Sequence, residues 1–160
     1  MEYKHKAEYM SLLREKFVRQ ARTDLLQYTK FTMPVFDPAP FHNAYYKILT
    51  RFAYGNIRKL MVFMPPQHGK SEGSTRRLPS FIDGLYPDKK IAVVSYSSPK
   101  ARKFNREIQR IIDTDEYREL FPDTRLNSSN VTTVAGAWLR NADECEIVGH
   151  RGGFKTVGVG

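Results

Sequence analysis

The stretch of sequence that decides the fold is Leu60-Met61-Val62-Phe63-Met64-Pro65-Pro66-Gln67-His68-Gly69-Lys70-Ser71. Its first five residues are all apolar, which is typical of a short strand buried on both faces. Two prolines end this strand, and a helix is predicted to begin near Lys70. A loop in this position can hold an anion, because its backbone N–H groups and the N-terminus of the helix form a concave site.

The end of the loop has the residue types that bind a nucleoside triphosphate. Gly69 would let the backbone approach the phosphates, Lys70 would reach the β- and γ-phosphates, and Ser71 would give its hydroxyl to Mg²⁺. The full pattern G-x-x-x-x-G-K-[S/T] is not met, because Met64 stands at the first glycine position. Gly-Lys-Ser alone is a weak signal, so an ordinary strand-to-helix turn with an exposed lysine is the alternative.

The sequence after the loop predicts an α/β fold. The helix that begins near Lys70 should bend or end at Pro79, and residues 91–96 indicate a second buried strand. A helix then runs from Pro99 to about Ile112. This order of strand, helix, strand and helix indicates a parallel sheet flanked by helices. The other expected elements are a short helix at 117–120, a short strand at 131–134, and a hairpin of strands 145–148 and 154–157.

The sequence before the loop is helical and is interrupted once. Residues 4–29 carry apolar side chains every three or four positions, which predicts a surface helix. Residues 33–40 contain three prolines and predict a linker or an extended arm. A second helix is expected from Phe41 to a stop at Gly55-Asn56. We therefore expect residues 1–40 to form a helical N-terminal extension with a proline-rich linker.

The composition describes a basic globular protein. The 160 residues include 26 Lys and Arg against 17 Asp and Glu, a net charge of +9. Such a surplus attracts polyanions such as nucleic acid or phosphate ligands, although a basic protein without a polyanionic partner is the alternative. Cys145 is the single cysteine, which fits a reducing compartment. No apolar run approaches the roughly 18 residues of a membrane helix, and no secretory signal is visible, so a soluble intracellular protein is expected.

The phosphate-binding motif resembles one particular family. An apolar strand followed by Pro65-Pro66-Gln67-His68-Gly69-Lys70-Ser71-Glu72 is similar to the deviant Walker A loop of the large terminase subunits of tailed bacteriophages. Arg76-Arg77-Leu78-Pro79 and residues 91–97, 116–122 and 153–160 also resemble family segments. The likeness runs from about residue 41 to the end. It implies that residues 41–160 are the front part of a P-loop NTPase-type ATPase domain, an incomplete parallel sheet flanked by helices.

The resemblance also implies a function. Family members hydrolyse ATP with Mg²⁺ to drive double-stranded DNA into a procapsid, in the cytoplasm of the bacterial host. Their implied partners are the portal protein, the small terminase subunit and further copies of the same chain in a ring, with no membrane. A nuclease domain, which cuts the DNA in this family, is not expected within these residues. Two alternatives are a helicase-like P-loop ATPase and a basic DNA-binding module without ATPase activity.

The resemblance assigns roles to individual residues. It implies that Lys70 is catalytic and that Ser71 is the Mg²⁺ ligand. Arg76 or Arg77 could supply an arginine finger, the alternative being a solvated helix face. Related motors bind adenine in the region of His42, for which helix capping or simple exposure is the alternative. The residues implied to bind the nucleotide are Pro66, Gln67, His68, Gly69, Lys70 and Ser71.

One part of the family's machinery has no match in the sequence. Hydrolysis in the family needs an apolar strand that ends in Asp-Asp or Asp-Glu, the Walker B strand. Asp143-Glu144 follows residues 139–142, which are not an apolar run. We therefore expect a chain truncated before the Walker B strand, inactive on its own and prone to aggregation through an unpaired strand edge.

Overall fold

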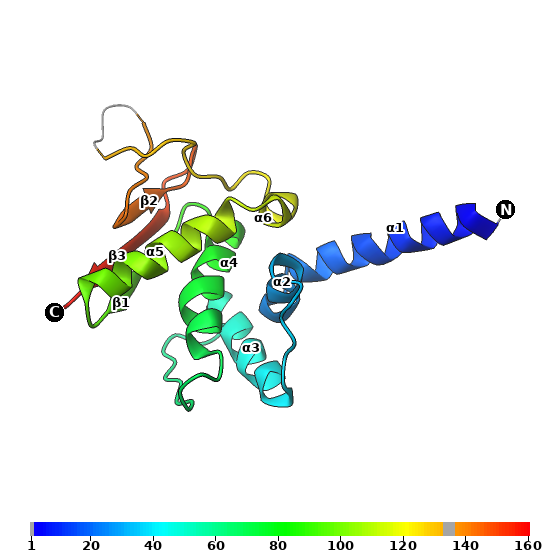
Figure 1. Ribbon diagram of the computed structural model, residues 1–160, viewed down its shortest axis with the longest axis horizontal. Helices are drawn as coiled ribbons and strands as arrows, with labels where there is room; N and C mark the ends of the chain where they lie inside the picture. Colours follow the sequence, from blue (N-terminus) through cyan, green and yellow to red (C-terminus); the bar gives the residue numbers. More distant parts are fainter. Residues whose placement is uncertain (1, 133–136) are drawn as a thin grey trace.

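The computed structural model describes residues 2–132 and 137–160, which form a small sheet covered by helices (Figure 1). Both helices and strands form after residue 70, so the expected mixture of α and β structure is confirmed at this level. The elements are α1 (Glu2–Ala21), α2 (Leu25–Thr32), α3 (Pro40–Ala53), the π-helix η1 (Glu72–Arg77), α4 (Leu78–Leu85), β1 (Lys90–Ser95), α5 (Ser98–Ile112), α6 (Asp115–Leu120), β2 (Glu144–Glu146) and β3 (Gly153–Gly158).

The single helix predicted over residues 4–29 is wrong, because the chain forms two helices there. Asp24 has an extended backbone, and its side chain accepts a hydrogen bond from the backbone N–H of Gln27, so it caps the start of α2. The side chain of Thr50 accepts a hydrogen bond from the N–H of Leu25 at 3.1 Å, which ties this start to α3. The first half of α1 extends away from the rest of the molecule (Figure 1), whereas Arg14 in its second half forms an ion pair with Glu119 of α6. No helix in the described part of the chain is long and apolar enough to cross a membrane.

The sheet has three strands in the order β1-β3-β2 and is mixed rather than parallel. Strands β1 and β3 pair in parallel, with Val93 opposite Thr156. The predicted hairpin is confirmed, since β2 and β3 pair in the antiparallel direction with Cys145 opposite Phe154. Helix α5 packs against β1 and β3, as a crossover helix does in a βαβ unit. The strand predicted at 131–134 falls partly outside the described residues, and Val131 forms an isolated bridge with Arg140.

The strand predicted at residues 60–64 does not form, and the expectation that it is buried on both faces is wrong. This segment has no paired neighbour, and Met61 and Phe63 are 80% and 85% exposed. Leu60, Val62 and Met64, which alternate with them, pack against the core. The segment therefore has the alternating faces of a strand, but no described strand pairs with it. Strand β1 also has a single neighbour, so it lies at an edge of the sheet with one side unpaired among the described residues.

The helix after the loop begins at Lys70, as predicted, but it does not end at Pro79 and continues to Leu85. It widens into η1 and returns to α-helix at Leu78, whose N–H donates to the carbonyl of Gly73. A proline inside a helix has no N–H to donate, and its ring clashes with the carbonyl four residues earlier. The wider turn immediately before Pro79 accommodates that ring. Such π-helical turns occur often beside functional sites.

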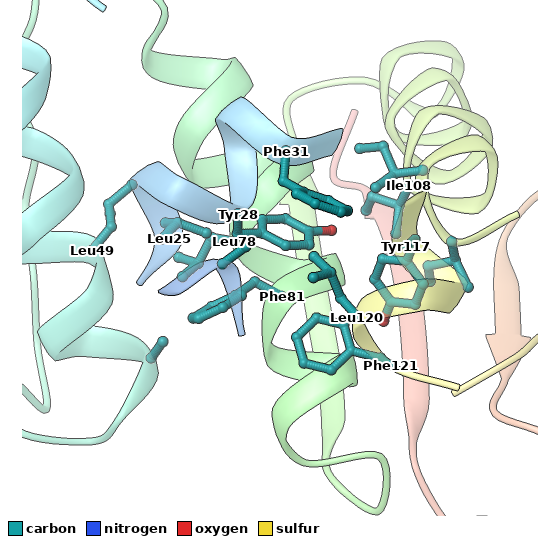
Figure 2. Close-up of a cluster of buried hydrophobic side chains, with 14 of the residues drawn as sticks. Leu25, Tyr28, Phe31, Leu49, Leu78, Phe81, Ile108, Tyr117, Leu120 and Phe121 are labelled. Carbon is teal, nitrogen blue, oxygen red and sulfur yellow. The ribbon is translucent and has the colours of Figure 1, made fainter. Parts of the chain in front are cut away.

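The hydrophobic core lies where α2, α4 and α6 meet (Figure 2). Tyr28 of α2 is at its centre, with its ring centroid 5.2 Å from that of Phe81 and 6.2 Å from that of Tyr117. Helix α2 therefore shares one core with elements from residues 41–160, although the sequence placed it in an N-terminal extension. The labelled core residues are Leu25, Tyr28, Phe31, Leu49, Leu78, Phe81, Ile108, Tyr117, Leu120 and Phe121.

Candidate phosphate-binding site

The loop between the extended segment and the helix turns sharply at two residues. Gly69 has a φ of 75°, in the left-handed region that glycine adopts without steric cost. Gln67 has a φ of 63° and is the one non-glycine residue with a positive φ in the described part of the chain. A non-glycine residue in this region is strained, and such strain is concentrated at ligand-binding and catalytic sites. The side chain of His68 lies within the loop, with Nδ1 2.7 Å from the carbonyl oxygen of Pro66.

Lys70 and Ser71 lie beside a cavity with a volume of about 630 Å³. Ser74 and Thr75 line the same side of it, one helical turn further on. Ser95 at the carboxyl end of β1 and Lys100 in the first turns of α5 line the other side. Ligand sites of α/β proteins lie at the carboxyl ends of strands, and a volume of this size is typical of small-molecule sites.

The polar groups around this cavity favour an anion. Two of its lining residues are lysines, several are hydroxyl residues, and the described lining residues include no Asp or Glu. The ammonium of Lys70 is exposed and makes no ion pair with a described residue. An anion with several oxygens, such as a phosphate chain, would find two cations and several hydroxyl donors here.

The same residues fit Mg²⁺ only together with phosphate. Mg²⁺ keeps several waters and binds through one or two protein oxygens plus substrate phosphates. Ser71 could supply one such oxygen. Among the described residues, no three His, Cys, Asp or Glu side chains cluster as a metal site would need. A metal ion at this place would therefore depend on the phosphates of a nucleotide for its negatively charged ligands.

Arg76 and Arg77 form an ion-pair network with Glu72. Arg76 donates to Glu72 and to Glu107 of α5, each at 2.6 Å, and Arg77 donates to Glu72 at 2.7 Å and to the hydroxyl of Thr32 at 2.8 Å. Neither guanidinium lines the cavity. These contacts join η1 to α2 and α5. Their geometry is that of structural cross-links and differs from that of a solvated helix face.

Hydrogen bonds within this network stabilise the charged forms of Glu72 and Arg76. Burial opposes the ionisation of Glu72, but hydrogen bonds from Arg77 and Arg76 outweigh it and lower the pKa of this carboxyl below its usual value. Burial likewise acts against the charged form of Arg76, while its bonds to Glu72 and Glu107 raise the pKa of the guanidinium. Glu72 and Arg76 therefore stay charged over the physiological range, and the network holds the π-helical turn in place.

Sequence reasoning located Lys70 and Ser71 at the start of the helix but missed the other groups around the cavity. Ser74 and Thr75 follow Ser71 at helical spacing, which would have placed them on the same side of the helix. Ser95 ends the next strand and Lys100 follows it, and ligand sites of α/β proteins lie at the carboxyl ends of strands. Each of these signals was present in the sequence.

Comparisons of the chain with protein-family models, with curated protein sequences and with solved structures gave no match. The likeness to large terminase subunits therefore rests on the motifs of the sequence.

Proposed function

We propose that this chain is the nucleotide-binding part of a DNA-packaging motor of the large terminase subunit type. ATP with Mg²⁺ would bind at the loop of residues 65–71, and hydrolysis would drive double-stranded DNA into a procapsid. The observation that carries the proposal is the strained loop that leads into a helix start, with Lys70 and Ser71 beside a cavity that favours anions. The proposal implies the portal protein, the small terminase subunit and a ring of copies as partners, in the cytoplasm of a bacterial host.

The chain's own residues would bind and orient the triphosphate. Lys70 would neutralise charge on the β- and γ-phosphates, and the hydroxyl of Ser71 would bind the metal ion. Mg²⁺, when bound, would neutralise the charge that develops on the leaving phosphate. No carboxylate that could orient the attacking water lies among the described residues around the cavity. Hydrolysis would therefore need a carboxylate from outside these residues.

The first test replaces Lys70 with alanine. We expect the variant to bind Mg²⁺-ATP at least tenfold more weakly than the parent chain, because the phosphates lose their nearest cation. Isothermal titration calorimetry measures the affinity directly. The control is Lys47→Ala, since Lys47 of α3 is also exposed but does not line the cavity. Equal ATP affinity in Lys70→Ala and in the parent chain would refute this site.

The outer face of α5 supports the proposed DNA partner. Lys103, Arg106 and Arg110 are spaced at three and four residues, so they form one stripe along the helix. All three are exposed, and none is ion-paired within the described residues. The opposite face of α5 is buried against the sheet and η1. A cationic stripe on a fixed helix can contact successive phosphates of a duplex.

The second test neutralises this stripe with Lys103→Gln, Arg106→Gln and Arg110→Gln together. If the stripe contacts phosphates, the slope of log affinity against log salt for a DNA duplex should fall by about two to three. Fluorescence anisotropy over a salt series gives this slope. The control carries the same charge change at Lys6, Lys16 and Arg19 on α1, which extends away from the sheet (Figure 1).

Equal losses in both triple variants would show that net charge alone attracts the DNA. The same experiment also separates the motor from the basic DNA-binding module. DNA binding with a steep salt dependence, without any ATP binding, would favour the module. A helicase-like ATPase would share the nucleotide site, and the likeness of residues 116–122 and 153–160 to terminase segments is what favours the packaging motor over it.

A further inference from the structure

Two side chains of helix α3 form hydrogen bonds with the backbone of the candidate phosphate loop. His42 and Tyr45 are three residues apart and thus lie on one face of α3. The ring nitrogen Nε2 of His42 is 3.2 Å from the carbonyl oxygen of His68. The hydroxyl of Tyr45 donates to the carbonyl oxygen of Lys70 at 2.7 Å. The two carbonyl groups on either side of Gly69 are therefore both bonded to α3.

The ring of His42 is itself fixed in orientation. The backbone N–H of Ala39 donates to Nδ1 of His42 at 2.9 Å, so Nδ1 accepts and Nε2 carries the proton that is donated to the carbonyl of His68. His42 thus caps the helix, which was one of the alternatives to adenine binding, and the ring has a second bond that capping does not explain. Phe41 and Phe36 pack beside it, with ring centroids 4.1 Å and 5.5 Å away.

The contact between α3 and the loop is close because two glycines lie there. A Cβ atom at Gly69 would be 3.0 Å from Nε2 of His42. A Cβ atom at Gly73, one turn further along the helix, would be 2.7 Å from Cε1 of Tyr45. The side chains of α3 occupy the space that side chains at these two positions would need. Gly69 is thus required by its left-handed backbone and also by the neighbouring histidine.

We infer that His42 and Tyr45 are positioning residues of the phosphate loop, an inference that rests on the proposed function. In a trans peptide the C=O group and the following N–H group point in opposite directions. Holding the carbonyl groups of His68 and Lys70 toward α3 turns the N–H groups of Gly69 and Ser71 away from α3. These N–H groups then point together to one side of the loop, where they can donate to a phosphate.

The test compares two neighbouring tyrosines of α3. Tyr45→Phe removes the hydroxyl that bonds the loop and keeps the ring that packs on Gly73. Tyr46→Phe is the matched control, because the buried hydroxyl of Tyr46 has no hydrogen-bond partner among the described residues. We expect Tyr45→Phe to bind Mg²⁺-ATP about three- to tenfold more weakly, the effect of losing one hydrogen bond, and Tyr46→Phe to bind it within twofold of the parent chain.

A second variant and two further measurements separate positioning from folding. His42→Gln keeps an acceptor that can cap α3 but not the imidazole bond to the loop, so it should weaken ATP binding while the unfolding midpoint stays near that of the parent. Adenosine has no phosphate, and its affinity should not change in either variant. Amide resonances of Gly69 and Ser71 should shift in Tyr45→Phe and not in Tyr46→Phe.

The outcomes distinguish the two proposals. If the parent chain binds ATP and both Tyr45→Phe and His42→Gln bind it equally well, the positioning role is refuted and the nucleotide site stands. Equal losses for ATP and adenosine would also refute it, because the effect would then be a general loss of structure. If the parent chain binds no ATP at all, the proposed function and this inference fall together.

Discussion

Replacing Tyr28 with alanine should destabilise the protein by about 3–5 kcal/mol, the usual cost of removing a large aromatic side chain from a core. Tyr28 is 0% exposed, and the rings of Phe81, Tyr117 and Phe121 surround it (Figure 2). Its hydroxyl also bonds that of Ser80 at 2.7 Å. The substitution would leave a cavity and remove the hydrogen bond to Ser80, whose hydroxyl would still donate to the carbonyls of Arg76 and Arg77. Urea denaturation followed by circular dichroism measures the free energy of unfolding.

The control for this prediction is Tyr9→Ala. Tyr9 lies on α1 and is 61% exposed, so its removal should change the free energy of unfolding by no more than about 0.5 kcal/mol. Comparing the two variants tests whether α2 is part of the main core. Helix α2 precedes the proline-rich linker, so the sequence alone does not predict this. A loss below about 1 kcal/mol in Tyr28→Ala would support residues 1–40 as a separable extension.

The N-terminal helices show what periodicity can and cannot predict. The apolar spacing of residues 4–29 correctly indicated helix with an apolar face, and Leu25 and Tyr28 on that face are buried. It could not say what this face packs against, because several partners, such as Phe81 and Tyr117, lie more than 50 residues further along the chain. The break at Asp24 had a readable signal, an aspartate followed three residues later by Gln27, which is a frequent start of a helix.

In the candidate site, too, the sequence predicted only those features that depend on residues adjacent in the chain. Gly-Lys-Ser after an apolar run placed the loop and the helix start correctly, since such a motif depends on residues that are adjacent in sequence. Two features depend on distant residues instead. The run 60–64 was read as a buried strand, but burial requires neighbouring strands that no local pattern specifies. The bonds from His42 and Tyr45 to the loop join residues 25 or 26 positions apart, and no spacing rule covers them.

Asp83 lies in a part of the core where a carboxyl group is costly. It belongs to α4, it is fully buried, and neither carboxyl oxygen has a hydrogen-bond partner among the described residues. The nearby hydroxyls of Tyr28 and Tyr117 are bonded to Ser80 instead. Burial therefore raises the pKa of Asp83 well above its usual value, because the charged form has lost water and gained no partner.

Because the pKa of Asp83 differs between the folded and unfolded states, the free energy of unfolding depends on pH. In the unfolded chain Asp83 ionises with an ordinary pKa near 4, whereas in the folded protein it stays protonated to a higher pH. The folded state is thus at no disadvantage below about pH 4, and stability is lost as the pH rises toward the folded pKa. The groups near Asp83 do not titrate in this range. Burial raises the pKa of both tyrosines, and it raises that of the Cys145 thiol to about 12.

Replacing Asp83 with asparagine should therefore stabilise the protein at pH 8 and have little effect at pH 4. Each unit by which the folded pKa exceeds the unfolded one is worth about 1.4 kcal/mol, so we expect a gain of at least that size at pH 8. The melting temperature should then rise by about 3–6 °C. Asp123→Asn is the control, since Asp123 is exposed and the charge change is the same. Thermal melts of both variants from pH 4 to pH 8 make the measurement. A gain that does not grow with pH would show that Asp83 is ionised to the same extent in the folded and unfolded chains, and that its carboxylate has a partner in solution.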